Sequence, residues 1–412
     1  RQRQMCIRDR NDGILYLVTR ERIMNEFFEM GPIRPPSEAQ SLLIRVSRNC
    51  PWNKCEFCHT YKGEQFSLRT VAEIKKDIDQ VKAIADEIHQ FSWRMGFAGQ
   101  LNQQVLRVLF GQPGRYHQAF QSVAGWLYFG GSQVFLQDAN SLIVKTADLV
   151  EILKYLKEKF PSIQRITSYA RAKTLAQKSV EELQELRQAG LSRIHVGMET
   201  GYDPLLQYMK KGVTAKEQIQ GGRNVVESGI SLSEYVMPGL GGNLWWREHA
   251  VETAKVLNQI DPDFIRLRTL YVRKDMPLFV RIEKGEFIRP ADDPIVSEIK
   301  LFIATLDGIH STVVSDHILN LLEEVQGKLP DEKERMIGII DRYLALPEET
   351  RFQFRVGRRL GYYRSLRDLE DPDLLRRVNQ IIDRVGRSDG EEGPKSPEEI
   401  EREIYGLMEN YI

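Results

Sequence analysis

From residue 41 onward, the hydrophobic positions follow two alternating periods. Short apolar runs that fit strands are each followed by a stretch with apolar residues at every third or fourth position, the spacing of an amphipathic helix. The expected strands are 41–46, 133–136, 164–168, 193–198, 231–237 and 263–270. The expected helices are 70–88, 146–159, 179–189, 215–228 and 247–259, with a helical insertion at 91–129. This alternation predicts an α/β fold with a parallel sheet, and six such units would form a partial (β/α) barrel.

The alternating pattern stops near residue 289, and only helical patterns follow, at 296–310, 315–324, 332–346, 372–387 and 397–411. We therefore expect a barrel domain over residues 24–290 and a helical C-terminal domain over residues 291–412. The first ten residues resemble translated adaptor sequence, so residues 1–23 are expected to be a non-native or disordered segment with the native start at Met24. A flexible polar tail is the alternative.

Composition places the chain among ordinary soluble proteins. It is 42% hydrophobic and 28% charged. Lysine plus arginine and aspartate plus glutamate each number 58, which argues against nucleic-acid binding through bulk positive charge. The sequence has no apolar run long enough to span a bilayer and no signal-peptide pattern. We expect no membrane contact and, because metal-binding thiols must stay reduced, a cytoplasmic location.

Three cysteines lie within nine residues, at Cys50, Cys55 and Cys58. The remaining cysteine, Cys6, lies in the excluded N-terminal segment. Thiolates at this density indicate a soft metal or an iron–sulfur cluster, which normally takes four cysteines. A four-iron cluster held by three leaves one iron open, where a substrate or cofactor can bind.

The cysteines allow two other interpretations. Zinc could take His59 as a fourth ligand, but structural zinc sites usually draw ligand pairs from separated segments, and His59 directly adjoins Cys58. A disulfide framework would require several paired cysteines in a short secreted chain. The cluster is the interpretation we favour.

The cysteine loop resembles that of the radical S-adenosylmethionine (radical SAM) superfamily, which ends in the same Cys-x-aromatic-Cys as Cys55 to Cys58, with Phe57 as the aromatic residue. The first gap is four residues here, whereas three are usual in the superfamily. The resemblance implies that a [4Fe-4S] cluster is bound by Cys50, Cys55 and Cys58. It also implies that S-adenosylmethionine chelates the open iron and that a flavodoxin-like or ferredoxin-like protein donates electrons.

The same resemblance gives roles to residues at the strand ends. Asp138 and Asn140 follow the second strand where many relatives carry a Gly-Gly-Glu run that contacts the amino group of the cofactor; helix capping is the alternative. Arg171 follows the third strand and could grip the carboxylate of the cofactor through paired hydrogen bonds, with a surface salt bridge as the alternative.

Residues 197–201, Gly-Met-Glu-Thr-Gly, resemble a Gly-x-Glu-Ser/Thr-Gly segment of the branch that includes oxygen-independent coproporphyrinogen oxidases and tRNA methylthiotransferases. The resemblance implies that Glu199 lies beside S-adenosylmethionine; a salt bridge to a neighbouring strand end is the alternative. Gly239 and Gly241 follow the fifth strand, where the family packs adenine, although such a turn can also be a tight connection.

Arg266 and Arg268 alternate with apolar residues on the sixth strand, so both face the same side. If that side is the barrel interior, the two arginines need an anionic partner and are candidates for substrate binding. Residues 351–367 mix arginine with aromatic residues, a combination that suits RNA. A basic helix packed on the barrel is the interpretation that we favour there.

These patterns together predict a radical SAM enzyme. One electron from the cluster would cleave S-adenosylmethionine and yield a 5′-deoxyadenosyl radical that removes hydrogen from an unknown substrate. Two alternatives stay open: an iron–sulfur electron-transfer or regulatory protein, and a zinc-stabilised RNA-binding protein.

Overall fold

A computed structural model describes residues 28–111, 118–387 and 395–407 of the protein. The N-terminal segment with Cys6 and Met24, and the end of the helix predicted at 397–411, lie outside the described residues.

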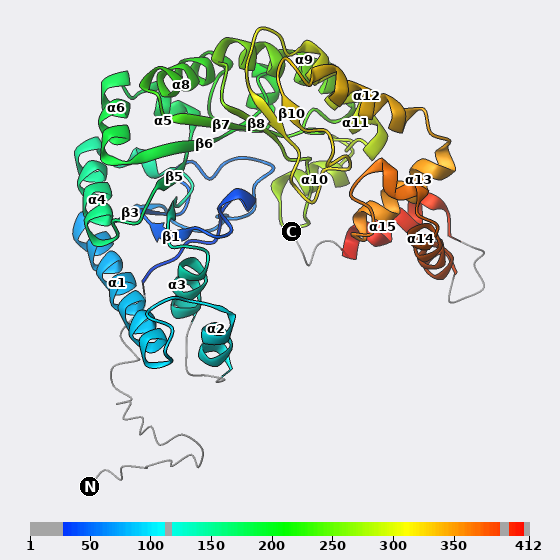
Figure 1. Ribbon diagram of the computed structural model, residues 1–412. Helices are drawn as coiled ribbons and strands as arrows, with labels where there is room; N and C mark the ends of the chain where they lie inside the picture. The colour runs from blue at the N-terminus through cyan, green and yellow to red at the C-terminus, as the bar shows by residue number, and fades with distance from the viewer. Residues whose placement is uncertain (1–27, 112–117, 388–394, 408–412) are drawn as a thin grey trace, which may run out of the picture.

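An eight-stranded sheet forms the centre of the molecule (Figure 1). Its strands, in spatial order, are β1 (Leu42–Arg45), β4 (Gln133–Gln137), β5 (Arg165–Ala170), β6 (Leu191–Glu199), β7 (Ser231–Val236), β8 (Phe264–Leu267), β9 (Thr312–Val314) and β10 (Gly327–Lys328). Every neighbouring pair from β1 to β9 is parallel, and β10 runs antiparallel to β9. The first six of these strands are the six predicted ones, which confirms the partial barrel. Two further strands, β2 (Ser47–Arg48) and β3 (Ser67–Leu68), pair with each other.

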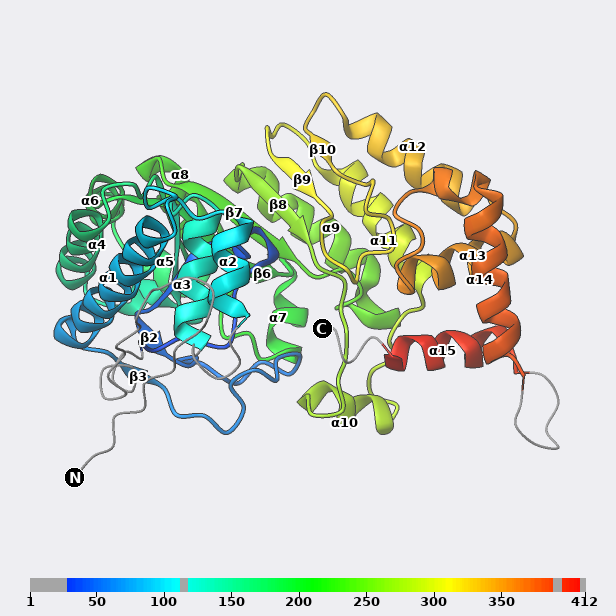
Figure 2. The ribbon, with the colours of Figure 1, turned by 60° about the horizontal axis from the view of Figure 1, so that its bottom comes forward.

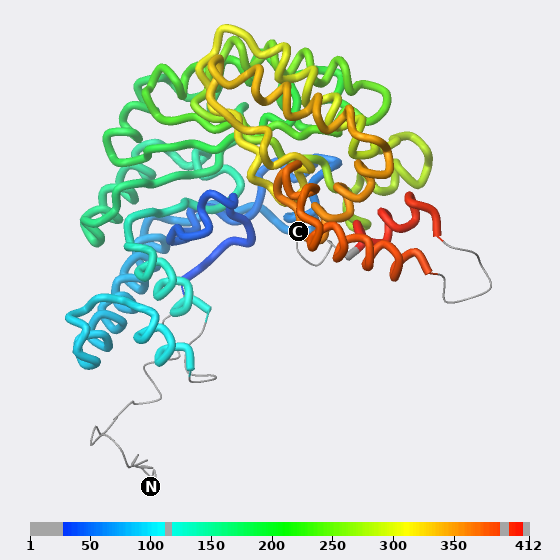
Figure 3. The backbone as a smooth tube through the Cα atoms, turned by 45° about the vertical axis from the view of Figure 1, so that its right-hand side comes forward, coloured from blue at the N-terminus to red at the C-terminus, as the bar shows by residue number. Residues whose placement is uncertain are grey.

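Helices cover the outer face of the curved sheet (Figure 1). The long ones are α1 (Val71–Arg94), α4 (Thr146–Lys159), α6 (Val180–Ala189), α8 (Ala215–Ser228), α9 (Gly242–Ile260) and α11 (Asp292–Thr305). Shorter helices are α2 (Gln103–Phe110), α3 (Gln118–Tyr128), α5 (Ala172–Ala176), α7 (Asp203–Tyr208) and α10 (Pro277–Glu283). Helices α2 and α3 fall in the predicted insertion and lie at the N-terminal end of the arc (Figure 3).

Local sequence fixes where the outer helices begin and end. Thr70, Ser179 and Thr214 each form a capping box at the start of α1, α6 and α8, with a glutamate three residues on. Gly190 and Gly229, both with positive φ, end α6 and α8. The chain therefore returns to the sheet after each helix. The carboxyl ends of successive parallel strands thus lie along one edge of the sheet.

Four helices, α12 (Lys333–Leu344), α13 (Glu348–Arg359), α14 (Pro372–Val385) and α15 (Pro397–Leu407), gather at the C-terminal end of the arc (Figure 2). Two expectations for this part of the chain were wrong. The sheet continues past residue 290 with β9 and β10, and residues 315–324 form turns instead of a helix. The amide of Asn320 donates to Leu267 O at 2.8 Å and its oxygen accepts from Thr269 N at 3.0 Å, so tertiary hydrogen bonds replace helical ones.

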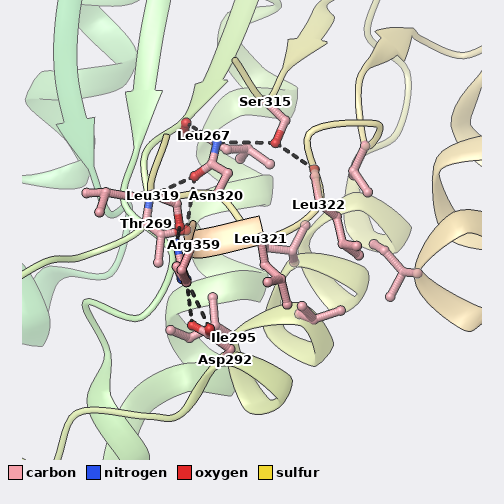
Figure 4. Close-up of a pocket in the computed structure, with 14 residues that line it drawn as sticks. Leu267, Thr269, Asp292, Ile295, Ser315, Leu319, Asn320, Leu321, Leu322 and Arg359 are labelled. Carbon is pink, nitrogen blue, oxygen red and sulfur yellow. Dashed lines mark hydrogen bonds and ion pairs between the residues drawn. The ribbon is translucent and has the colours of Figure 1, made fainter. Parts of the chain in front are cut away.

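The arginines of α13 are engaged inside the protein. Arg355 pairs with Glu401 at 2.6 Å, Glu348 at 2.8 Å and Asp293 at 3.2 Å. Figure 4 shows Arg359 bonded to both oxygens of Asp292, at 2.9 and 3.0 Å, beside a cavity of about 10 Å³ under the end of β8. These arginines therefore fix α13 to α11. Among the described residues no helix is both long and apolar enough to cross a membrane.

Candidate functional site

A cavity of about 430 Å³ lies at the carboxyl ends of the parallel strands. Its wall includes Arg171 after β5, Glu199 at the end of β6, Tyr235 on β7 and Arg268 after β8. Cys50, Cys55 and Cys58 line the same cavity, together with Phe57. In barrels of parallel strands this edge is where active sites gather.

The three cysteines are half-buried free thiols. Their loop is held from both sides: Glu56 N donates to Met209 O at 3.0 Å, and Glu56 O accepts from Leu278 N at 2.9 Å. The Glu56 carboxylate also pairs with Lys210 at 2.6 Å. The loop is thus pinned between the end of α7 and the start of α10, with its sulfurs on the cavity side.

Positive charge surrounds these thiols. Burial raises the pKa of Cys55, whereas Lys211 and Arg171 act to lower it. Burial is the largest single influence on the pKa of Lys211 and acts to lower it, but Glu199 and Cys55 together outweigh burial. The pKa is therefore raised, and the ammonium stays charged. Thiolates are the form that binds iron, and nearby cations favour them. The donor set therefore fits an iron–sulfur cluster. Within the described residues, no group of three or more His, Cys, Asp or Glu is arranged to hold a single metal ion.

Glu199 has an unusual backbone for a residue at a strand end. Its φ is 65°, and the β6–β7 register shifts between Gly197 and Glu199. Such a conformation costs on the order of 1–3 kcal/mol and is common at ligand sites. Its Oε1 accepts a hydrogen bond from Lys211 Nζ at 3.0 Å, and its carbonyl accepts from Met237 N at 3.0 Å. The kink places the carboxylate on the cavity wall.

Arg171 is tied to the loop that follows α7. Its Nη2 donates to Lys211 O at 2.8 Å, and its guanidinium lies 5.1 Å from the centre of the Trp52 ring. Trp52 Nε1 in turn donates to Lys210 O at 2.7 Å. Arg171 therefore joins the cysteine loop to the loop that carries Lys211.

Asp138 and Asn140 are fully buried and are not among the described residues that line the cavity. Asp138 Oδ2 accepts from Arg45 Nε at 2.7 Å, and its Oδ1 accepts from Tyr61 at 3.0 Å. Asn140 Oδ1 accepts from Arg171 N at 3.0 Å. In this arrangement their side chains are used within the protein, and Ala139 between them lines the cavity instead.

Three other predicted site residues also lie off the described cavity wall. Gly239 N donates to the buried Glu298 at 2.9 Å, and Gly241 is packed against the backbone at Trp245. Arg266 faces the interior beneath the cavity, where it pairs with Asp316 at 2.9 Å. Arg268, two residues on, does line the cavity.

A buried polar network joins the loops after β6 and β7. His249 Nδ1 lies 2.8 Å from Thr200 Oγ1, and its Nε2 lies 3.1 Å from Met237 O and 3.4 Å from Glu298 Oε1. Burial lowers the pKa of His249 to about 4 and raises that of Glu298 to about 8. The neutral imidazole therefore links the segment after Glu199 to the glycine-rich turn.

Sequence reasoning missed several cavity residues. Tyr169 on β5 and Tyr235 on β7 line the wall from the two strands on either side of β6, and Arg273 follows β8. Each tyrosine is the last residue but one of its parallel strand, and a position at that end of a strand could have identified both as site candidates.

Comparison with known proteins identifies the class. Residues 118–254, about a third of the chain, match the family model described as the radical SAM superfamily. This match supports a radical SAM domain in this part of the chain, and the cofactors of that superfamily are a [4Fe-4S] cluster and S-adenosylmethionine. The matched residues do not include the cysteine loop.

The curated relatives are distant. A tRNA uridine(34) acetyltransferase of Methanocaldococcus jannaschii is 23% identical over 108 residues, which are 26% of this chain and 20% of the relative. The same enzyme of Methanocaldococcus infernus is 23% identical over 110 residues, or 26% and 21% of the two chains. The alignment thus spans about a fifth of these relatives.

Solved structures are similar only in outline. The Methanocaldococcus infernus Elp3 with an N-terminal deletion is 14% identical with a TM-score of 0.38, covering 51% of this chain and 54% of that one. Methylornithine synthase (PylB) is 13% identical with a TM-score of 0.40, covering 72% and 69%. At this degree of likeness these structures carry no argument about function.

Proposed function

We propose that Cys50, Cys55 and Cys58 hold the [4Fe-4S] cluster of this enzyme and that S-adenosylmethionine binds beside it in the cavity. The observation that supports this is the presence of all three free thiols in the wall of one cavity at the carboxyl ends of the strands. When bound, the reduced cluster supplies the electron that splits S-adenosylmethionine into methionine and a 5′-deoxyadenosyl radical.

The protein's own residues bind and orient the cofactors. Lys211 and Arg171 supply positive charge near the thiolates. Glu199, already an acceptor for Lys211, would accept a hydrogen bond from the cofactor's amino group, and Arg171 would donate to its carboxylate. The cavity wall of Phe57, Leu270 and Met276 would exclude water from the reacting atoms. The reaction is hydrogen abstraction from an organic substrate in the cytoplasm, with a flavodoxin-like or ferredoxin-like electron donor.

An RNA substrate is a second candidate because the curated relatives are named as tRNA enzymes. Those relatives are matched over only a fifth of their length, and the arginines of α13 are already paired with carboxylates. We therefore favour a small substrate that enters the cavity.

The test is anaerobic reconstitution followed by iron, sulfide and zinc analysis, with the 5′-deoxyadenosine formed from S-adenosylmethionine under reduction as the second readout. C50A, C55A and C58A should each lose most of the iron and all product, while C6A serves as the matched control and should match the wild type. Iron and sulfide undiminished in all three variants would remove the cysteines from the site. A loaded, reducible cluster that yields no 5′-deoxyadenosine would favour an electron-transfer protein, and zinc without sulfide would favour the zinc alternative.

A further inference from the structure

The cavity carries an excess of positive charge. The described residues that line it include six cationic side chains and a single carboxylate, Glu199; the cations are Arg34, Arg171, Lys173, Lys211, Arg268 and Arg273. The whole chain has equal numbers of acidic and basic residues, so this excess is a property of the site and not of the protein.

Most of these cations have protein partners. Lys211 pairs with Glu199 at 3.0 Å, and Lys173 pairs with Glu217 at 3.4 Å. Arg273 pairs with Asp275 at 3.1 Å. Arg268 and Arg34 differ, because their guanidinium groups form no ion pair or hydrogen bond with any part of the chain that the structure describes; both side chains are exposed. An arginine that lines a cavity without a protein partner is free to bind an anionic ligand there.

The cofactors of the proposed function do not neutralise this excess. The positive iron core largely offsets the charge of its thiolates, and S-adenosylmethionine is a zwitterion that carries an additional sulfonium. Together the two groups bring little net charge into the cavity. Arg268 is therefore left without a neutralising group from the protein or the cofactors, and a further anion can bind there.

Tyr235 provides a second, independent indication at the same place. Its hydroxyl is buried and has no hydrogen-bond partner among the described residues. Tyr235 lies opposite Arg266 in the β7–β8 register, and Arg268, whose N donates to Val236 O at 2.9 Å, is two residues past Arg266. Tyr235 and Arg268 are therefore diagonal neighbours across the two strands. Buried hydroxyls are nearly always hydrogen-bonded in folded proteins, so a bound group should complete this one. Burial raises the pKa of Tyr235 to about 12, which keeps the hydroxyl protonated as a donor.

We propose that Arg268 and Tyr235 form an anion-binding subsite that holds a carboxylate or phosphate group of a small organic substrate. Arginine can bind either group through two parallel hydrogen bonds, and the tyrosine hydroxyl adds a third donor. Ile33, Leu270, Tyr271 and Met276 supply apolar wall for the carbon part of the substrate. A cavity of about 430 Å³ lies within the usual range for small-molecule sites. This inference rests on the proposed function, because the subsite uses the part of the cavity that the cluster and S-adenosylmethionine leave free.

The experiment measures anion binding by calorimetry to the anaerobically reconstituted protein saturated with S-adenosylmethionine, at constant ionic strength in chloride. The probes are inorganic phosphate, acetate and a short RNA oligonucleotide. Phosphate or acetate should bind, and the tighter of the two identifies the anionic group. R268Q should weaken that binding at least tenfold and Y235F about two- to fivefold. R268K keeps the charge and loses the geometry for paired hydrogen bonds. Its affinity for the anion should therefore lie between that of R268Q and that of the wild type. R107Q on α2, an exposed arginine outside the cavity, is the matched control and should bind as the wild type does.

Equal affinity of the wild type and R268Q for the anion would overturn the proposal, as would no binding of either small anion. Binding of RNA alone would also overturn it and favour the RNA substrate. An equal loss of S-adenosylmethionine affinity in R268Q would reassign Arg268 to the cofactor. Failure of the proposed function is recognised separately, because it appears in the same preparations as missing iron and sulfide or as no 5′-deoxyadenosine.

Discussion

The ammonium of Lys211 lies 3.0 Å from the carboxylate of Glu199, and both side chains are more than four-fifths buried. The pair closes the edge of the cavity next to the cysteine loop, with Lys211 Nζ 5.4 Å from the centre of the Phe57 ring. Removing either member would leave a charge with little water around it, which is far more costly than losing a surface pair.

The first prediction concerns Glu199 and Arg171 as ligands of S-adenosylmethionine. E199Q and R171Q should each weaken its binding about ten- to a hundredfold, the effect of losing a charge-assisted hydrogen bond of about 1.5 to 3 kcal/mol. Iron content in E199Q should stay at the wild-type level because Glu199 is not a cluster ligand. Equilibrium binding to the reconstituted protein gives the affinity, and E252Q on the exposed face of α9 is the control. Unchanged affinity in both variants would remove the two residues from the cofactor site.

The second prediction concerns Lys211. K211M should leave Glu199 buried without its partner and take positive charge away from Cys55, so cluster loading should fall at least severalfold. The double variant K211M/E199Q should recover stability relative to K211M, because the unpaired carboxylate is gone. The melting temperature measures the change in stability, and the iron content measures the change in cluster loading. K216M, which changes an exposed lysine on α8, should keep both near wild type, and a K211M protein as stable and as loaded as K216M would contradict this account.

The third prediction is a pH dependence that depends on Glu298. Its folded pKa of about 8 lies above the ordinary value of 4.5, so the folded state holds a proton that the unfolded state releases between those pH values. The contribution of Glu298 to the free energy of unfolding should therefore fall as pH rises from 4.5 to 8, by up to about 1.4 kcal/mol per pH unit and a few kcal/mol in total. His249 acts in the opposite sense: its pKa of about 4 makes stability fall as pH drops below 6.5.

E298Q keeps an acceptor for Gly239 N and removes the titration, so its stability should decline less than that of the wild type between pH 6.5 and 8. Denaturant unfolding at a series of pH values measures the difference. Parallel curves for E298Q and the wild type across that range would refute the assignment. E323Q removes a more exposed glutamate that pairs with Arg358. It tests whether the loss of any glutamate gives the same change in the pH dependence of stability.

The fourth prediction links the C-terminal helix to the cavity. Tyr405 on α15 stacks on Tyr271 of the cavity wall, with ring centres 5.0 Å apart, and the Arg289 guanidinium lies 4.2 Å from the Tyr405 ring. Y405A should lower stability by about 1 to 3 kcal/mol and loosen the wall, whereas Y405F should retain most of the stacking. Amide hydrogen exchange of residues 269–273 measures directly how readily this part of the cavity wall opens. Equal exchange in Y405A and the wild type would show that α15 does not support it.

The sequence predicted the strands of the barrel because their apolar runs are local and each is bounded by capping and glycine signals, as at Ser179 and Gly190. The cysteine loop was visible for the same reason. The partners of Asp138 could not be predicted, since Arg45 and Tyr61 lie 93 and 77 residues away in the sequence. The turn at 315–324 was mistaken for a helix because Asn320 is held by residues of the β8 region, 51 and 53 positions away. The local periodicity of hydrophobic residues contains no information about contacts between residues so far apart in the sequence.

The pairing of β9 with β8 has a practical consequence for anyone expressing parts of this chain. A fragment cut near residue 290 would leave the backbone groups of Phe264 to Arg266 without their neighbour, creating an open parallel edge. Exposed edges of this kind recruit strands from other molecules and promote aggregation. The C-terminal segment therefore covers this edge of the sheet with β9 and β10, and soluble fragments should extend at least through β10.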